Sequence, residues 1–238
     1  MNTSKHVRQV VLDTETTGMN KDGLIYVGHR IIEIGCIEVI NRRLTGRHYH
    51  VYIQPDMPID PEAIAVHGIT DEFLIDKPRF ADIADEFIDF IKGANLVIHN
   101  APFDVGFIDQ EFRFLNKKTQ TTEEMSTVTD TLEMAKNMFP GKRNNLDVLC
   151  ERYGIDNKHR VLHGALLDAE ILADVYLLMS GGQKDLNLAN NESGEFNTGK
   201  RPRKNTAPLT VIYANEEELK AHESRLDLVE ESGSCLWR

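Results

Sequence analysis

The chain has 238 residues, a hydrophobic fraction of 41% and a formal net charge of −11. This length allows one large domain, or one domain of ordinary size with an appendage, and the ordinary apolar fraction excludes wholesale disorder. No window approaches the roughly 18 uninterrupted apolar residues of a membrane span. Residues 1–8 lack the apolar core of a signal peptide. A cytoplasmic location without membrane association is therefore expected.

The cysteines and the acidic charge limit the classes of partner. Cys36, Cys150 and Cys235 are far apart and show no metal-ligand spacing, so neither a disulfide framework nor a zinc site is expected. Duplex-binding proteins usually carry a basic face. An acidic enzyme would hold phosphates weakly by itself, so a nucleic-acid enzyme of this charge would need a partner that tethers it to its substrate.

The first half of the chain indicates a β-meander followed by a helix. Segments rich in β-branched residues predict three strands, over residues 7–13, 30–40 and 47–54. Residues 55–61, with three prolines, are predicted to be a loop. Apolar residues then recur at helical spacing over 80–91 and stop before Gly93, which predicts an amphipathic helix.

Short strands and helices alternate farther along the chain. Strands are expected over 95–100 and 128–130, and helices over 102–115, 131–138, 146–153 and 164–179. A meander followed by alternating strands and helices predicts an α/β fold with a mixed sheet flanked by helices.

The composition changes after this region, which divides the chain into three parts. Gly, Asn, Lys and Ser dominate residues 181–206, which are predicted to be a flexible linker between a domain over 1–180 and a tail over 207–238. The tail holds a strand-like run over 209–213 and a helical candidate over 216–231. Such a segment cannot build a core alone, so it is expected to dock on another protein.

Acidic residues follow two of the predicted strands. Asp13 and Glu15 close the first strand as a D-x-E pair, so both carboxylates project from one face. Asp104 comes shortly after the strand over 95–100, at the start of a helix, where open α/β sheets place their ligands. The alternative is that Asp104 has a purely structural role, in which its negative charge interacts favourably with the dipole of this helix.

A third element joins a histidine to an aspartate. His163 and Asp168 are five positions apart, which on a helix separates side chains by about 140°. Gly164 indicates that His163 lies on a mobile loop while Asp168 lies in the helix that follows. A loop histidine directed at carboxylates would be a general base. Clustered carboxylates repel one another unless cations neutralise them, and oxygen ligands favour two Mg²⁺ or Mn²⁺ ions.

The order and spacing of these residues resemble a known family. Asp13-x-Glu15, Asn100-x-x-Phe103-Asp104 and His163-x4-Asp168 resemble the three motifs of the DEDDh 3′→5′ exonuclease superfamily. Strings such as VLDTETTGM, RIIEIG, FPGKRN, LHGALLDA and ESGSCLW resemble, more narrowly, the proofreading (ε) subunits of bacterial DNA polymerase III.

The resemblance implies a ribonuclease-H-like α/β fold and a role for each site residue. Asp13, Glu15 and Asp168 would bind the two metal ions and the substrate, and Asp104 would complete the metal site directly or through water. The base that deprotonates the attacking water would be His163. The resemblance also implies that Glu62 and His67, within PEAIAVHGI, contact the terminal nucleotide.

The implied partners are DNA and other replication proteins. The substrate would be a single-stranded or frayed 3′ end of DNA, and the polymerase catalytic (α) subunit would bind the tail. Gln183-x-x-Leu186-x-Leu188 resembles the peptide that bacterial proteins insert into the sliding clamp. The resemblance leaves room for a small accessory (θ-like) subunit. The alternatives are a free-standing exonuclease acting on RNA or single-stranded ends, and a non-catalytic subunit that stabilises its polymerase.

Overall fold

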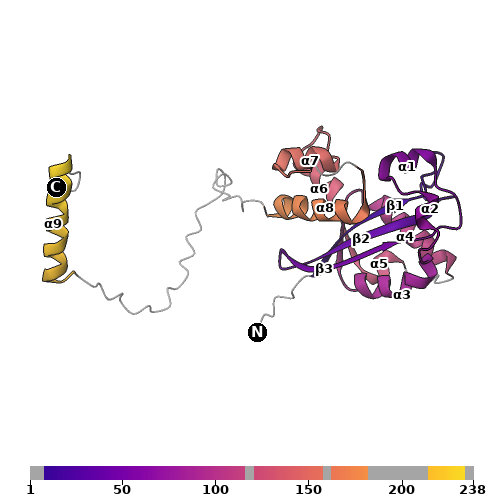
Figure 1. Ribbon diagram of the computed structural model, residues 1–238, viewed down its shortest axis with the longest axis horizontal. Helices are drawn as coiled ribbons and strands as arrows, with labels where there is room; N and C mark the ends of the chain where they lie inside the picture. Colours follow the sequence, from indigo (N-terminus) through magenta and orange to yellow (C-terminus); the bar gives the residue numbers. More distant parts are fainter. Residues whose placement is uncertain (1–7, 116–120, 158–161, 182–213, 234–238) are drawn as a thin grey trace, which may run out of the picture. The chain divides into compact units, whose positions relative to one another are not determined.

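The computed structural model describes residues 8–115, 121–157, 162–181 and 214–233. The chain divides into two compact units, Met1–Asp185 and Leu186–Arg238. The described part of the first unit is a sheet with helices on both faces, and that of the second is one helix (Figure 1). The mixed sheet flanked by helices, predicted from the sequence, is confirmed.

The elements of the first unit follow the predicted order. Its strands are β1 (Arg8–Thr16), β2 (Ile31–Ile40), β3 (Arg43–Tyr52), β4 (Asn95–Ile98) and β5 (Thr127–Asp130). Its helices are α1 (Pro61–His67), α2 (Asp71–Leu74), α3 (Phe80–Ile91), α4 (Ala101–Phe114), α5 (Thr122–Met125), α6 (Thr131–Met138), α7 (Leu146–Tyr153) and α8 (Ala165–Ser180).

The sheet changes its strand direction at its central strand. Its order is β3-β2-β1-β4-β5. β1 and β2, and β2 and β3, pair antiparallel, whereas β1 and β4, and β4 and β5, pair parallel. The carboxyl ends of β1, β4 and β5 therefore lie at one edge of the sheet, which is where ligands bind in open α/β sheets.

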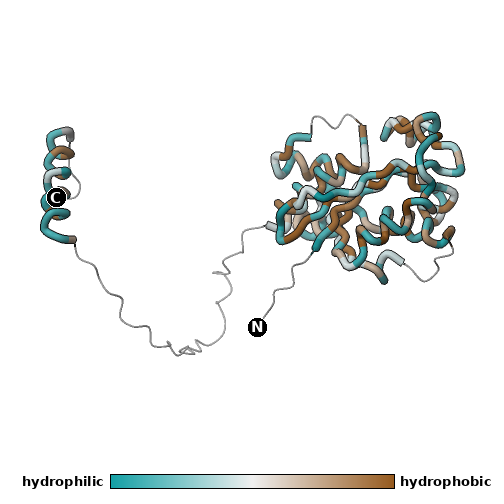
Figure 2. Tube along the Cα trace, turned by 60° about the horizontal axis from the view of Figure 1, so that its bottom comes forward, coloured by the Kyte–Doolittle hydropathy of each residue, from teal (hydrophilic) through white to brown (hydrophobic). Residues whose placement is uncertain are grey.

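Alternation along β1 builds a core on each face of the sheet. Val10 and Leu12 pack in the cluster that contains the apolar sides of α3 and α4. Val11 faces the other way and packs against α8. Figure 1 shows α3, α4 and α5 on one side of the strands and α6, α7 and α8 on the other. In Figure 2 the apolar residues are concentrated along the strands between these layers. This alternation puts Asp13 and Glu15 on the face that α8 covers.

A glycine in β2 allows α8 to approach the sheet closely. Gly35 pairs with Asp13 across the β1–β2 ladder. A Cβ atom at Gly35 would overlap the backbone of Ala165 and Leu166 in the first turn of α8. Only a residue without a side chain permits this contact, and the contact brings the amino-terminal end of α8 beside the carboxyl half of β1.

Two sequence predictions between residues 41 and 61 were wrong at their boundaries. β3 begins at Arg43 and not at residue 47, because Asn41 and Arg42 both adopt positive φ angles, of 52° and 63°, in a two-residue hairpin turn. Pro61, predicted to end a loop, is the first residue of α1. Proline suits this position because a backbone N–H in the first helical turn has no acceptor within the helix, so the absence of this group in proline removes no hydrogen bond.

The second unit is described only in its helix, α9 (Glu216–Ser232), which agrees with the helical candidate over 216–231. Asn215 caps it, with the side chain accepting a hydrogen bond from the Glu218 N–H at 2.8 Å. The predicted clamp peptide, Gln183, Leu186 and Leu188, and the strand-like run over 209–213 lie outside the described residues. Among the described helices, none combines the length and the apolar character that a bilayer span requires.

Candidate active site

The carboxyl edge of the sheet opens into a cavity of about 270 Å³ that we call the acidic pocket. It is lined by residues from β1, from the β4–α4 junction, from the start of α7 and from the start of α8. These residues are Asp13, Thr14, Glu15, His99, Asn100, Phe103, Asp104, Asn145, Leu146, Asp147, His163 and Asp168. All five residues of the three sequence motifs that were assigned to the metal site or to the base therefore line one cavity.

β1 contributes to the acidic pocket from both of its faces. Asp13 and Glu15 project on the α8 side, whereas Thr14 between them projects on the α4 side. The Thr14 hydroxyl donates a hydrogen bond of 2.7 Å to Oδ1 of Asp104. Thr14 thus fixes the orientation of a carboxyl group that comes from a different element. Sequence reasoning missed Thr14, although its place between two carboxylates on a strand was a usable signal.

The β4–α4 junction places Asp104. Asn100 precedes α4 in the left-handed conformation with a φ of 72°, and its N–H donates to Oδ1 of Asp130 at 3.1 Å. The same carboxylate oxygen accepts from the Leu132 N–H at 2.8 Å, so it joins the ends of β4 and β5. The sharp turn at Asn100 directs the first turn of α4, and Asp104 with it, into the sheet edge, where Asp104 is only 3% exposed.

His163 lies on the segment that leads into α8, as predicted. Its Nδ1 is 3.4 Å from Oδ2 of Asp168, which is buried in the first turn of α8. Ligand atoms of Glu15, His163 and Asp168 all lie within 4.8 Å of one another. The His163 side chain is 45% exposed, so it is accessible to a water molecule.

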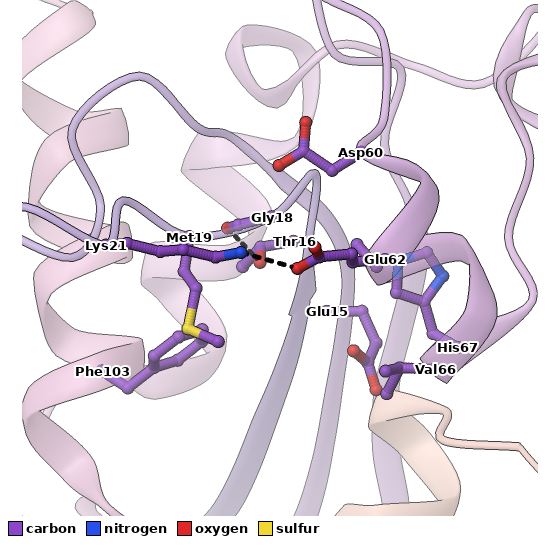
Figure 3. A pocket seen from close by; sticks show the side chains of 11 residues that line it. Glu15, Thr16, Gly18, Met19, Lys21, Asp60, Glu62, Val66, His67 and Phe103 are labelled. Atoms are coloured by element: carbon purple, nitrogen blue, oxygen red, sulfur yellow. Dashed lines mark hydrogen bonds and ion pairs between the residues drawn. The ribbon is translucent and has the colours of Figure 1, made fainter.

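A second cavity, of about 260 Å³, adjoins the first, and we call it the α1 pocket. It is lined by Glu15, Thr16, Gly18, Met19, Lys21, Asp60, Glu62, Ala63, Val66, His67 and Phe103. Glu15 and Phe103 line both pockets. The two residues that were assigned to the terminal nucleotide, Glu62 and His67, thus lie in a cavity that shares two lining residues with the acidic pocket. Figure 3 shows them on α1 above Glu15.

Three polar groups of the α1 pocket, on Lys21, Glu62 and His67, have defined partners. Lys21 Nζ is 2.9 Å from Oε2 of Glu62, and Lys21 is the only lysine or arginine among the described residues that line either pocket. The Ile69 N–H donates to Nδ1 of His67 at 3.0 Å, so in the neutral ring the proton is on Nε2. Burial lowers the pKa of His67, which favours that neutral form. Sequence reasoning did not identify Lys21, which lies in a loop without a recognisable pattern.

Burial makes the charged form of Asp104 unfavourable. Desolvation raises the pKa of this carboxyl from 3.8 to about 7, against the opposing effect of the Thr14 hydrogen bond. A bound cation would reverse the effect, because an adjacent positive charge favours the carboxylate. The acidic pocket is therefore a place where folding stability and cation binding are linked.

We predict that Asp104→Asn raises the melting temperature of the metal-free protein at about pH 8. Because the folded-state pKa is raised, the stabilising contribution of this carboxyl is complete below pH 3.8 and is lost as the pH rises through about 7. Asparagine removes the buried charge and still accepts the Thr14 hydrogen bond. Each increase of about 1 kcal/mol in the free energy of unfolding should raise the melting temperature by about 2–4 °C in a protein of this size.

Melting curves of both proteins in EDTA would measure this difference. The difference in melting temperature between Asp104→Asn and the wild type should be smaller at about pH 5, where the wild-type carboxyl is protonated. Comparing the two proteins at each pH cancels the contributions of His67 and His99, whose pKa values burial lowers. A variant that melts below the wild type at both pH values would contradict the prediction.

Known proteins share both the sequence and the fold. A family model described as Exonuclease matches residues 10–176. DNA polymerase III subunit epsilon of Salmonella typhimurium is 60% identical, covering 97% of each chain. The Escherichia coli protein of that name is 58% identical with the same coverage.

Solved structures agree on the fold at much lower identity. The nuclease domain of 3′hExo, a DEDDh family member bound to rAMP, aligns with a TM-score of 0.62 at 18% identity, covering 75% of this chain and 94% of that one. Exonuclease X in complex with 5′ overhanging duplex DNA gives 0.55 at 24%, covering 74% and 94%. The chain therefore belongs to the exonuclease family and, within it, to the epsilon subunits of DNA polymerase III.

Proposed function

We propose that the chain is the 3′→5′ proofreading exonuclease of a replicative DNA polymerase, and that its acidic pocket hydrolyses the last phosphodiester bond of a DNA strand. The exonuclease activity follows from family membership. The observation that supports the site is the convergence of Asp13, Glu15, Asp104, Asp168 and His163 on one cavity at the sheet edge.

The donor set fits divalent metal ions. Five carboxylates and two histidines line the acidic pocket, and Lys21 in the adjoining pocket is already paired with Glu62. Two Mg²⁺ or Mn²⁺ ions held there would stabilise the attacking and leaving oxygens of the displacement. In this proposal Asp13, Glu15 and Asp168 hold the ions, and Asp104 completes the site directly or through water.

The remaining residues have different roles in the two pockets, proton removal in the acidic pocket and nucleotide binding in the α1 pocket. His163 is exposed enough to reach a water molecule and lies 3.4 Å from Asp168, which orients its ring. We assign it the removal of the proton from the attacking water. The α1 pocket would receive the terminal nucleotide, with Glu62 and His67 as its polar contacts and Phe103 and Met19 as apolar ones.

The choice between DNA and RNA is open to a direct test. Strands of each, labelled at the 5′ end, are incubated with the full chain and Mg²⁺, and the products are separated by length. We expect DNA to shorten one nucleotide at a time from the 3′ end, faster at a mismatched primer terminus than at a paired one. Faster shortening of RNA would favour the free-standing exonuclease, and no shortening of either strand would favour a non-catalytic subunit.

The acidic charge of the chain is the reason to expect tethering. A net charge of −11 opposes the phosphate contacts that hold most nucleic-acid enzymes on their substrate. α9 is a capped helix with Leu219, Leu228 and Val229 exposed, so it carries apolar surface that a partner could cover. We propose that the tail, residues 207–238, binds the polymerase catalytic subunit, that Gln183, Leu186 and Leu188 bind the sliding clamp, and that the linker raises the effective concentration of the nuclease at the primer end.

We predict that a fragment of residues 1–180 remains an active nuclease but no longer co-purifies with the polymerase catalytic subunit. All strands and helices that line the two pockets lie within these residues, and α8 ends at Ser180. Activity on single strands and co-purification with the polymerase would be measured side by side. If the fragment binds the polymerase as tightly as the full chain, the tail is not the docking segment.

A further inference from the structure

The segment that carries His163 is attached to the end of α1 by two neighbouring contacts. The His163 backbone N–H donates a hydrogen bond of 3.1 Å to the carbonyl of Val66, in the last turn of α1. The preceding residue, Leu162, packs on Gly68. The contact is so close that a Cβ atom added at Gly68 would lie 2.6 Å from Leu162 Cδ1. Contacts of Val66, Leu162 and Gly68 thus connect the end of α1, which lines the α1 pocket, to His163 in the acidic pocket.

The end of α1 is shaped to receive this contact. Gly68 caps the helix in the left-handed conformation with a φ of 73°, and its N–H donates to the Ile64 carbonyl at 2.8 Å. This conformation costs glycine little, and the missing side chain leaves the space that Leu162 fills. Leu162 is 49% exposed, so its contact with Gly68 is not part of the main hydrophobic core.

We propose that Leu162 is a positioning residue for His163 and that its packing on Gly68 couples the α1 pocket to the placement of the base. This inference rests on the proposed role of His163. Val66 and His67 line the α1 pocket, and in Figure 3 they lie together at the end of α1, close to Glu15. A nucleotide that orders the end of α1 would also order the segment that holds His163. The chemical step would then be fastest when the pocket is correctly filled.

The test measures the single-turnover rate and the KM for single-stranded DNA with the full chain. Leu162→Ala should lower the rate about tenfold or more, because a catalytic group misplaced by about 1 Å can cost ~10²-fold. The KM should change little, since the residues that contact the nucleotide are intact. Leu162→Met keeps a long apolar side chain and should restore most of the rate. The matched control is Leu178→Ala, a leucine of α8 that is also 49% exposed and should leave the rate unchanged.

A second pair of variants separates the contact from backbone strain. Gly154 caps α7 with a φ of 69° and has no atom near an added Cβ, whereas the same addition at Gly68 meets Leu162. Gly68→Ala and Gly154→Ala should lower the melting temperature to a similar extent, but only Gly68→Ala should lower the rate.

A double-mutant cycle distinguishes failure of this inference from failure of the proposed function. If Leu162 acts through His163, then Leu162→Ala should have almost no further effect on the rate in a His163→Ala background. Equal effects of Leu162→Ala in both backgrounds would overturn the inference, as would an unchanged rate for Leu162→Ala in the wild type. An unchanged rate for His163→Ala would instead overturn the proposed role of the base.

Discussion

Asp168→Asn should reduce the exonuclease rate by about three orders of magnitude while the chain stays folded. Asp168 is 3% exposed in the first turn of α8, within 4.8 Å of ligand atoms of Glu15 and His163. A metal ion stabilises the transition state by several kcal/mol, and each 1.4 kcal/mol corresponds to a factor of about ten. Asp13→Ala should have an effect of similar size for the same reason.

Two features predict that the fold survives these changes. Loss of one carboxylate relieves repulsion among the remaining ones in the metal-free protein, and asparagine has nearly the shape of aspartate. Asp174→Asn is the control, since Asp174 is an exposed aspartate on the same helix and outside the acidic pocket. Melting curves and primer degradation would be measured together. More than a few per cent of wild-type activity in a folded Asp168→Asn variant would refute its assignment as a metal ligand.

Much of the fold could be predicted because its elements are long and periodic. The apolar spacing of α3 and the β-branched runs of β1 and β2 are strong local patterns. The helices α2 and α5, with four residues each, were not predicted, because they are too short to show a helical period. α1 was missed because Pro61 was interpreted as part of a loop rather than as the first residue of a helix.

In the candidate site, too, local sequence patterns predicted some features, whereas contacts between distant segments could not be predicted. The common face of Asp13 and Glu15 follows from strand alternation, and the position of Asp104 follows from its place after β4. The contact of Gly35 with the first turn of α8 could not be predicted, because it depends on the register of β2 against β1 and on the packing of a helix about 130 residues away. The contact of Leu162 with Gly68 likewise joins segments with no shared sequence pattern.

His163→Ala should lower the rate of the chemical step by about 10²–10⁴-fold, the usual contribution of a general base, and should leave the KM for DNA nearly unchanged. The geometry also allows another role, because His163 offers a ligand atom within 4.8 Å of Glu15 and Asp168. A histidine that held a metal ion would, when removed, raise the metal concentration needed for half-maximal activity. A histidine that only accepts a proton would not.

Metal titrations of the His163→Ala variant separate the two roles. We expect the half-saturating Mg²⁺ concentration to stay within about twofold of the wild-type value while the maximal rate falls by about 10²-fold or more. Added imidazole should restore part of the rate in the variant and have no effect on the wild type, because it can occupy the space left by a side chain that is 45% exposed. His163→Gln keeps hydrogen-bonding groups but cannot accept a proton at neutral pH, so it should be as slow as the alanine variant. A large rise in the metal requirement without imidazole rescue would assign His163 to the metal site instead.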